Sequence, residues 1–237
     1  MQEHQAAGLT YDPSWGRRPA ARLGRALIRG GLRPLIWLHV APKVAGTERL
    51  VDVAGPVIVA ANHASHLDTP VIMQSLPRPL RGRIGVVAAA DYFFTKRWKA
   101  GLVTLAFATL PIERRRLSET TRGRINAMIE DGWSMLVYPE GTRSLDGHLQ
   151  MLKYGTAHFA IDYGLPIVPV YLTGTFQAHG KGSKWPSRHP VTVRFGEPIA
   201  PPTDLASDER RAATERLTAT LTDALRALAA ESGVTAP

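Results

Sequence analysis

Residues 57–68 read VIVAANHASHLD and contain the clearest signal of the chain's architecture. The first five residues form a continuous apolar run, which is typical of a strand buried on both faces of a parallel sheet. The run stops at Asn62, where small and polar residues predict a turn, and residues 69–76 are expected to form a helix. A buried strand that leads through a polar turn into a helix is a building unit of an α/β fold.

The same alternation of apolar runs and amphipathic segments continues along the chain. Further strands are expected at residues 49–53, 84–89, 109–112, 134–138, 167–172 and 191–195. Helices are expected at residues 91–106, 118–131, 154–163 and 207–230, and an exposed polar loop at residues 174–190. We therefore predict an α/β protein whose central sheet is mostly parallel or mixed and is covered by helices.

The composition limits the chemistry that the chain can carry. Its 237 residues are 44% hydrophobic and 21% charged, which is typical of a globular protein. The sequence contains no cysteine, which excludes disulfides, thiolate metal sites and thiol nucleophiles.

Positive charge is concentrated near the N-terminus. The chain has 29 basic and 20 acidic residues, and residues 1–50 hold eight of the basic and three of the acidic ones. Residues 20–41 combine leucines, isoleucines and a tryptophan with four arginines, a pattern typical of amphipathic helices at an anionic membrane surface. The alternative is a helix that packs on the main domain with solvated arginines. Gly30, Gly31 and Pro34 favour two short helices over one.

These patterns predict a division of the chain and its location. We expect residues 1–45 to form an N-terminal arm and basic amphipathic helices at the membrane surface, and residues 46–237 to form the α/β domain. Residues 1–15 lack the apolar core of a signal peptide, and the longest stretch without charged residues, 163–180, is broken by prolines. We expect a protein that does not span the membrane and stays on its cytoplasmic side.

The first candidate site is the turn after the strand at 57–61, where Asp68 follows His63 by five positions. At a strand–turn–helix junction the turn can fold His63 back, so that Asp68 accepts a hydrogen bond from one ring nitrogen. The other nitrogen is then available as a general base near neutral pH. Simpler alternatives are that Asn62 or Ser65 caps the helix, or that the histidines are ordinary turn residues. A metal site that includes His66 would match no established ligand spacing.

The second candidate site follows the strand at 134–138 and reads PEGTRS at residues 139–144. Arg143 beside hydroxyls and a glycine is suited to bind phosphate, because the guanidinium fork matches phosphate oxygens. Arg114 ends another apolar run and is a candidate for the same role, and Lys153 follows shortly after. The alternative for these arginines is a solvated charge on a surface turn.

Together these segments resemble the glycerophospholipid acyltransferases, most closely the bacterial 1-acylglycerol-3-phosphate (lysophosphatidic acid) acyltransferases. The resemblance covers roughly residues 50–200. The matching positions are Asn62, His63 and Asp68 for the first motif, Arg114 for the second, residues 139–144 for the third and residues 167–170 for the fourth. The chain departs from the family where a Lys-Glu-Leu-like stretch often follows the second strand, because residues 90–92 read ADY. The usual glycine of the second motif is also missing.

The resemblance implies the glycerolipid acyltransferase fold and a direct acyl transfer. His63, oriented by Asp68, would deprotonate the free hydroxyl of lysophosphatidic acid, which would then attack acyl-CoA or acyl-ACP to give phosphatidic acid. Arg114 and Arg143 would hold the acceptor phosphate. The residues expected to shape the glycerol site are Glu140, Gly141 and Thr142. No metal is expected, and no cofactor apart from the acyl thioester co-substrate. The lack of cysteine and of a Gly-x-Ser-x-Gly motif favours direct transfer over an acyl-enzyme.

The expected partners are a lysophospholipid, an acyl thioester and an anionic membrane surface. The resemblance places the protein at the cell membrane, peripheral or monotopic on the cytoplasmic face. One alternative is the same chemistry on another acceptor, such as glycerol-3-phosphate, another lysophospholipid or a non-phosphorylated alcohol. A second is a basic membrane- or nucleic-acid-binding protein without catalysis. We do not expect a nucleic-acid partner, because aromatic residues are only 7% and the basic residues cluster in an apolar segment.

Overall fold

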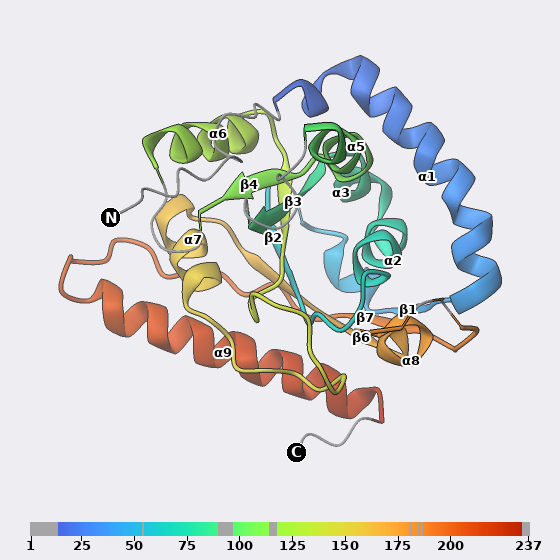
Figure 1. Cartoon of the computed structure of the whole chain (residues 1–237). Coiled ribbons are helices and arrows are strands. Elements are labelled where there is room, and N and C mark those ends of the chain that lie inside the picture. The colour runs from blue at the N-terminus through green and yellow to red at the C-terminus, as the bar shows by residue number, and fades with distance from the viewer. Residues whose placement is uncertain are drawn as a thin grey trace, which may run out of the picture.

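The computed structural model of the chain has a mixed sheet at its centre (Figure 1). It describes residues 14–233 except 54, 90–96, 114–117, 181, 184 and 186. Within these residues, seven strands lie in the order β1-β7-β6-β2-β5-β3-β4. They are β1 (Lys43–Ala45), β2 (Ile58–Ala61), β3 (Ile84–Ala89), β4 (Leu110–Ile112), β5 (Ser134–Val137), β6 (Ile167–Thr173) and β7 (Thr192–Phe195). The pairing of β6 with β7 is antiparallel and the other five pairings are parallel, which confirms the predicted fold class.

Helices cover both faces of this sheet. The α-helices are α1 (Pro19–Val40), α2 (Asp68–Ser75), α3 (Arg78–Gly82), α5 (Arg97–Phe107), α6 (Glu119–Glu130), α7 (Gly155–Tyr163), α8 (Thr175–His179) and α9 (Arg210–Glu231). Two short 3-10 helices are η2 (Ser14–Arg17) and η3 (Thr47–Leu50). In Figure 1, α1, α2 and α5 lie on one side of the sheet, and α7 and α9 lie on the other.

The sheet separates two hydrophobic cores, and alternate residues of β2 face different ones. Val59 and Ala61 belong to the core that includes α2, whereas Ile58 and Ala60 belong to the core that includes α7 and α9. All four side chains are fully buried. This two-sided burial is why residues 57–61 read as an unbroken apolar run rather than as alternating apolar and polar residues.

Several predicted boundaries are confirmed by their local chemistry. The Ser118 side chain accepts a hydrogen bond from the Thr121 backbone N–H and so caps α6. Gly164 ends α7 in the left-handed conformation, which glycine adopts without steric strain. The leucines that mark the inner face of α9 are all buried: Leu217, Leu221, Leu225 and Leu228.

The N-terminal segment differs from the prediction in two ways. Residues 19–40 form one continuous helix, not two short ones, although Pro34 lies inside it. Gly30 and Pro34 are on the exposed face of this helix, whereas Ile36 and Val40 on the other face are buried against the domain. The burial of these apolar side chains outweighs the low helix propensity of glycine and proline. In addition, we expected the α/β domain to begin at residue 46. The sheet already includes residues 43–45, because β1 pairs with β7.

Two further predictions were wrong about local structure. In place of the strand expected at residues 49–53, the chain forms η3, which ends at Leu50, and then a turn at residues 51–52; η3 follows Gly46, which has the left-handed conformation. The turn at Gly46 is fixed because a Cβ there would lie 2.1 Å from the Phe195 carbonyl oxygen. The loop expected at residues 174–190 contains the short helix α8, which starts after Gly174.

Candidate active site

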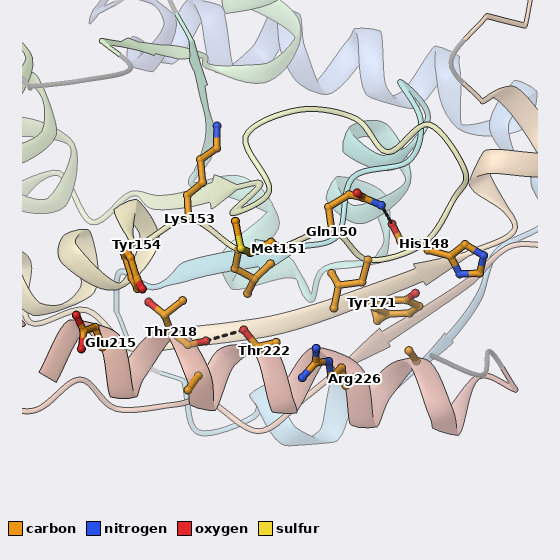
Figure 2. A pocket seen from close by; sticks show the side chains of 14 residues that line it. His148, Gln150, Met151, Lys153, Tyr154, Tyr171, Glu215, Thr218, Thr222 and Arg226 are labelled. Carbon is orange, nitrogen blue, oxygen red and sulfur yellow. Dashed lines mark hydrogen bonds between the residues drawn. The ribbon is translucent and has the colours of Figure 1, made fainter. Parts of the chain in front are cut away.

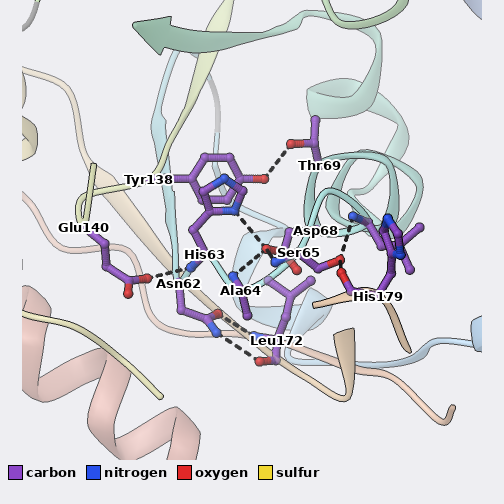
Figure 3. A network of polar contacts seen from close by, with 11 residues as sticks. Asn62, His63, Ala64, Ser65, Asp68, Thr69, Tyr138, Glu140, Leu172 and His179 are labelled. Carbon is purple, nitrogen blue, oxygen red and sulfur yellow. Dashed lines mark hydrogen bonds and ion pairs between the residues drawn. The ribbon is translucent and has the colours of Figure 1, made fainter. Parts of the chain in front are cut away.

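The two predicted loops meet at the carboxyl ends of neighbouring parallel strands. One loop leaves β2 and the other leaves β5, and these strands pair directly. The Ser144 backbone N–H donates to the His63 carbonyl at 2.7 Å. The His63 backbone N–H in turn donates to Oε1 of Glu140 at 2.6 Å (Figure 3). The sheet order therefore brings together motifs that are about 80 residues apart, at the edge where α/β proteins form their sites.

His63 and Asp68 form the predicted pair. The distance between His63 Nδ1 and Asp68 Oδ2 is 2.9 Å. Because a carboxylate accepts hydrogen bonds, we expect Nδ1 to carry the proton, which leaves Nε2 of the neutral imidazole with a free lone pair. Asp68 is the first residue of α2 and is fully buried, whereas the His63 side chain keeps 18% of its surface exposed. The turn thus buries the carboxylate and leaves part of the imidazole accessible.

The backbone of the turn holds the Asp68 carboxylate in place. Its Oδ2 also accepts hydrogen bonds from the backbone N–H groups of Ala64 and Ser65, each at 2.8 Å. Three donors therefore converge on one oxygen, which fixes the direction from which the carboxylate meets the imidazole. Asp68 is in this geometry a positioning residue for His63.

Tyr138 packs against one face of the imidazole. Its ring stacks on the His63 ring with centroids 3.9 Å apart and an angle of 16° between the planes. The hydroxyls of Tyr138 and Thr69 are 2.7 Å apart and share a hydrogen bond. Burial first, and then the charge of Asp68, raises the pKa of Tyr138 well above its ordinary value, so the phenol stays neutral. The sequence marked Tyr138 only as the last residue of a strand; its place directly before the Pro-Glu-Gly turn was the available signal.

Glu140 connects the two loops from inside the protein. It is 3% exposed, and its second oxygen, Oε2, accepts from the Gln150 backbone N–H at 2.9 Å. Burial raises the pKa of Glu140 to about 7, against the two backbone hydrogen bonds, which lower it. Because both oxygens are used by backbone groups, the contacts give Glu140 a positioning role. Its contact with the glycerol of a substrate stays a prediction.

Asn62 and Ser65 are not helix caps, contrary to the simpler alternative. Asn62 pairs with Leu172 of β6 as a strand residue would: its Nδ2 donates to the carbonyl and its Oδ1 accepts from the N–H. The Ser65 hydroxyl donates to the His179 carbonyl and accepts from the Leu67 N–H. No side chain caps α2. Both polar residues instead fix the turn to β6 and α8.

The remaining predicted residues lie on the outer side of the second loop. Gly141 and Thr142 are exposed and Arg143 is partly exposed. Burial first, and then the charge of Arg143, lowers the pKa of His66. Arg114 lies outside the described residues. Among the residues that are described, no three His, Asp or Glu side chains are grouped so that they could hold a metal ion.

Comparison with known proteins finds acyltransferases among the similar sequences. The chain is similar to the 1-acyl-sn-glycerol-3-phosphate acyltransferase of Limnanthes douglasii, with 34% identity over 176 residues, 73% of this chain and 59% of the relative. A human relative, 1-acyl-sn-glycerol-3-phosphate acyltransferase beta, is 28% identical over 154 residues, 64% of this chain and 53% of the relative. The chain thus spans less than two thirds of the length of these relatives.

A solved structure shares the fold. The crystal structure of the 1-acyl-sn-glycerophosphate acyltransferase PlsC from Thermotoga maritima superposes with a TM-score of 0.61 and 23% identity, over 92% of this chain and 84% of that one. A model of the family described as Acyltransferase matches residues 41–173. This match is more than half of the chain and includes His63, Asp68 and the whole second loop. The protein therefore belongs to the Acyltransferase family.

Proposed function

We propose that the chain transfers a fatty acyl group from an acyl thioester to the free hydroxyl of lysophosphatidic acid, which gives phosphatidic acid. The observation that carries this proposal is the 2.9 Å contact between His63 Nδ1 and the buried Asp68 carboxylate, beside the loop of Arg143. The names of the similar proteins support the choice of acceptor.

In the proposed reaction, His63 Nε2 accepts the proton of the acceptor hydroxyl as the oxygen attacks the thioester carbonyl carbon. The tetrahedral intermediate then collapses, the carbon–sulfur bond breaks, and the proton on His63 passes to the leaving thiolate of CoA or the acyl carrier protein. Asp68 stabilises the imidazolium that forms between these two steps. Arg143, with Arg114, would bind the acceptor phosphate and hold the hydroxyl against His63, which supplies effective molarity.

The test is product analysis with the purified chain, lysophosphatidic acid and either acyl-CoA or acyl-ACP. We expect phosphatidic acid by mass spectrometry, and a fall in kcat of about 10²- to 10⁴-fold for His63→Ala. Asp68→Asn should also be impaired, because a neutral amide can hold the imidazole in the wrong tautomer and cannot stabilise the imidazolium. His158→Ala, which changes an exposed histidine on α7, is the matched control. Near-normal turnover by His63→Ala would contradict the mechanism, and turnover of only non-phosphorylated alcohols would contradict the acceptor.

We also propose that the protein binds the cytoplasmic face of an anionic membrane. The geometry of α1 supports this proposal. Its outward face carries the exposed apolar residues Leu23, Leu27 and Leu38, which are 65%, 69% and 58% exposed. Exposed apolar side chains on an amphipathic helix favour insertion into the headgroup region of a bilayer. No helix in the described part of the chain is long and apolar enough to cross a membrane.

The inward face of α1 matches the alternative in which the helix packs on the domain. Arg25 is buried, and its Nη2 donates to the carbonyls of Gly16 and Thr104. Arg29 donates to the carbonyl of Arg81. Burial lowers the pKa of both arginines to about 10. Two of the four arginines that we expected at lipid headgroups therefore fix the helix to the protein and leave its apolar face outward.

A further inference from the structure

Lys153 lies against the second loop, although the proposed reaction has not used it. Its backbone N–H donates to the Pro139 carbonyl at 2.9 Å, so the two segments run side by side. Its side chain follows the backbone of Gly141: a Cβ on that glycine would lie 2.7 Å from Nζ, 3.1 Å from Cε and 3.2 Å from Cδ. The ammonium group is thus brought to the turn that carries Arg143.

Gly141 has a backbone conformation that favours glycine. Its φ of +73° lies in the left-handed region, where side chains are strained. The Lys153 side chain passes over this residue, and its Nζ lies 2.7 Å from the position that a Cβ would take. The absence of a side chain at Gly141 therefore leaves room for the lysine beside the turn.

The Lys153 side chain also points away from the neighbouring cavity. This cavity, of about 640 Å³, lies between residues 148–154 and α9, and Tyr171, Thr218 and Arg226 are among the residues that line it (Figure 2). Lys153 extends from its rim in the direction opposite to α9. Among the described residues, no carboxylate forms an ion pair with it. Its charge is exposed and available to an anionic ligand.

We infer that Lys153 is a second substrate-binding cation, which acts with Arg143 on the phosphate of a substrate. This inference rests on the proposed function. A phosphomonoester carries about 1.5 to 2 negative charges at neutral pH, which two cations match better than one. Gly141 lies between Glu140 and Ser144, which both bond the main chain of His63. In lysophosphatidic acid the reacting hydroxyl is a few bonds from the phosphate, whereas the phosphates of CoA are separated from the thioester by the pantetheine arm. The geometry therefore favours the acceptor phosphate.

The experiment compares Lys153→Ala and Lys153→Arg with Lys43→Ala, which removes an exposed lysine of β1 at the far edge of the sheet. KM and kcat are measured separately for lysophosphatidic acid, for monoacylglycerol and for acyl-CoA. We expect Lys153→Ala to raise the KM for lysophosphatidic acid by about 10- to 100-fold, the effect of one charge-assisted hydrogen bond. The KM for acyl-CoA and the turnover of monoacylglycerol should stay unchanged, and Lys153→Arg should recover most of the loss.

Three results would overturn the inference. An unchanged KM for lysophosphatidic acid would remove Lys153 from the binding site. A rise confined to acyl-CoA would assign the lysine to the phosphates of the donor. An equal loss with both acceptors, together with a lower melting temperature, would show a purely structural role.

A binding measurement separates this inference from the proposed function. If the wild-type protein acylates neither acceptor, the proposed function fails, but calorimetric titration with micellar lysophosphatidic acid and monoacylglycerol still tests Lys153. Weaker binding of only the phosphorylated lipid by Lys153→Ala would then support the inference, and equal binding by both proteins would contradict it.

Discussion

At the scale of single residues, the site depends on contacts that hold one imidazole from several directions. Asp68 fixes its Nδ1, Tyr138 stacks on its face, and Glu140 and Ser144 bond its main chain. The first contact was predictable from the sequence, because both residues lie in one short turn. The other contacts were not predictable, because they require β5 to pair with β2. The order of strands in the sheet cannot be read from the residues of either loop.

The stacking contact leads to a prediction about Tyr138. Tyr138→Phe keeps the stacked ring and loses the hydrogen bond to Thr69, so we expect kcat to fall by about threefold or less. Tyr138→Ala removes the ring, whose stacking contributes about 0.5–1.5 kcal/mol, and leaves His63 free to rotate, so kcat should fall by about tenfold or more. Steady-state kinetics with lysophosphatidic acid measures both. Thr69→Val is the matched control and should behave like Tyr138→Phe. If the Phe variant were as impaired as the Ala variant, the hydroxyl and not the stacking would hold the ring.

At the scale of elements, sequence patterns predicted best where burial is regular. The all-apolar runs of β2, β3 and β6 are confirmed because both faces of these strands are covered by helices. The patterns failed where tertiary contacts outweigh local preference. Pro34 remains inside α1 because buried Ile36 and Val40 hold the helix. The short helix α8 was missed because its five residues lie in a polar, glycine-bearing segment.

The outward face of α1 gives a prediction at this scale. Helix α1 packs against α5, and both helices carry exposed apolar side chains: Leu23 and Leu27 on α1 are 65% and 69% exposed, and Trp98 and Leu102 on α5 are 63% and 58% exposed. We expect Leu23→Asp with Leu27→Asp to weaken binding to vesicles of phosphatidylglycerol and phosphatidylethanolamine by about tenfold or more, because each buried leucine contributes about 1.5–3 kcal/mol. Co-sedimentation measures the effect.

The control for the α1 prediction is an equally exposed apolar residue elsewhere. Val51 is 78% exposed and follows η3, and Val51→Asp should leave vesicle binding unchanged. Equal binding by the double α1 variant and the wild-type protein would contradict a membrane role for this face. Such a result would leave the packing of α1 on the domain as its remaining function.

At the scale of the whole molecule, the burial of Glu140 connects the site to stability. Because burial raises its pKa from 4.5 to about 7, the folded protein holds this proton more tightly than the unfolded chain. The stabilisation from Glu140 is complete below about pH 4.5 and is lost as the pH rises through about 7. Relative to Glu140→Gln, which does not titrate, the wild-type free energy of unfolding should therefore fall by about 2 kcal/mol between about pH 5 and pH 8.

Urea unfolding at several pH values measures this difference. Glu215→Gln, which changes an exposed glutamate of α9, is the control and should follow the wild-type curve. If the curves of wild type and Glu140→Gln stayed parallel over this range, Glu140 would be ionised throughout. The two backbone hydrogen bonds would then outweigh the effect of burial on its pKa.

The bonds on both sides of the His63 main chain have a consequence for the catalytic cycle. With its N–H bonded to Glu140, its carbonyl to Ser144 and its Nδ1 to Asp68, the histidine is held at both its main chain and its ring while the two-chain lipid of the proposed reaction forms next to it. We expect the product to leave by sliding laterally into the bilayer while the histidine stays in place. The next acceptor would then meet a base that is already aligned, with no resetting step between rounds.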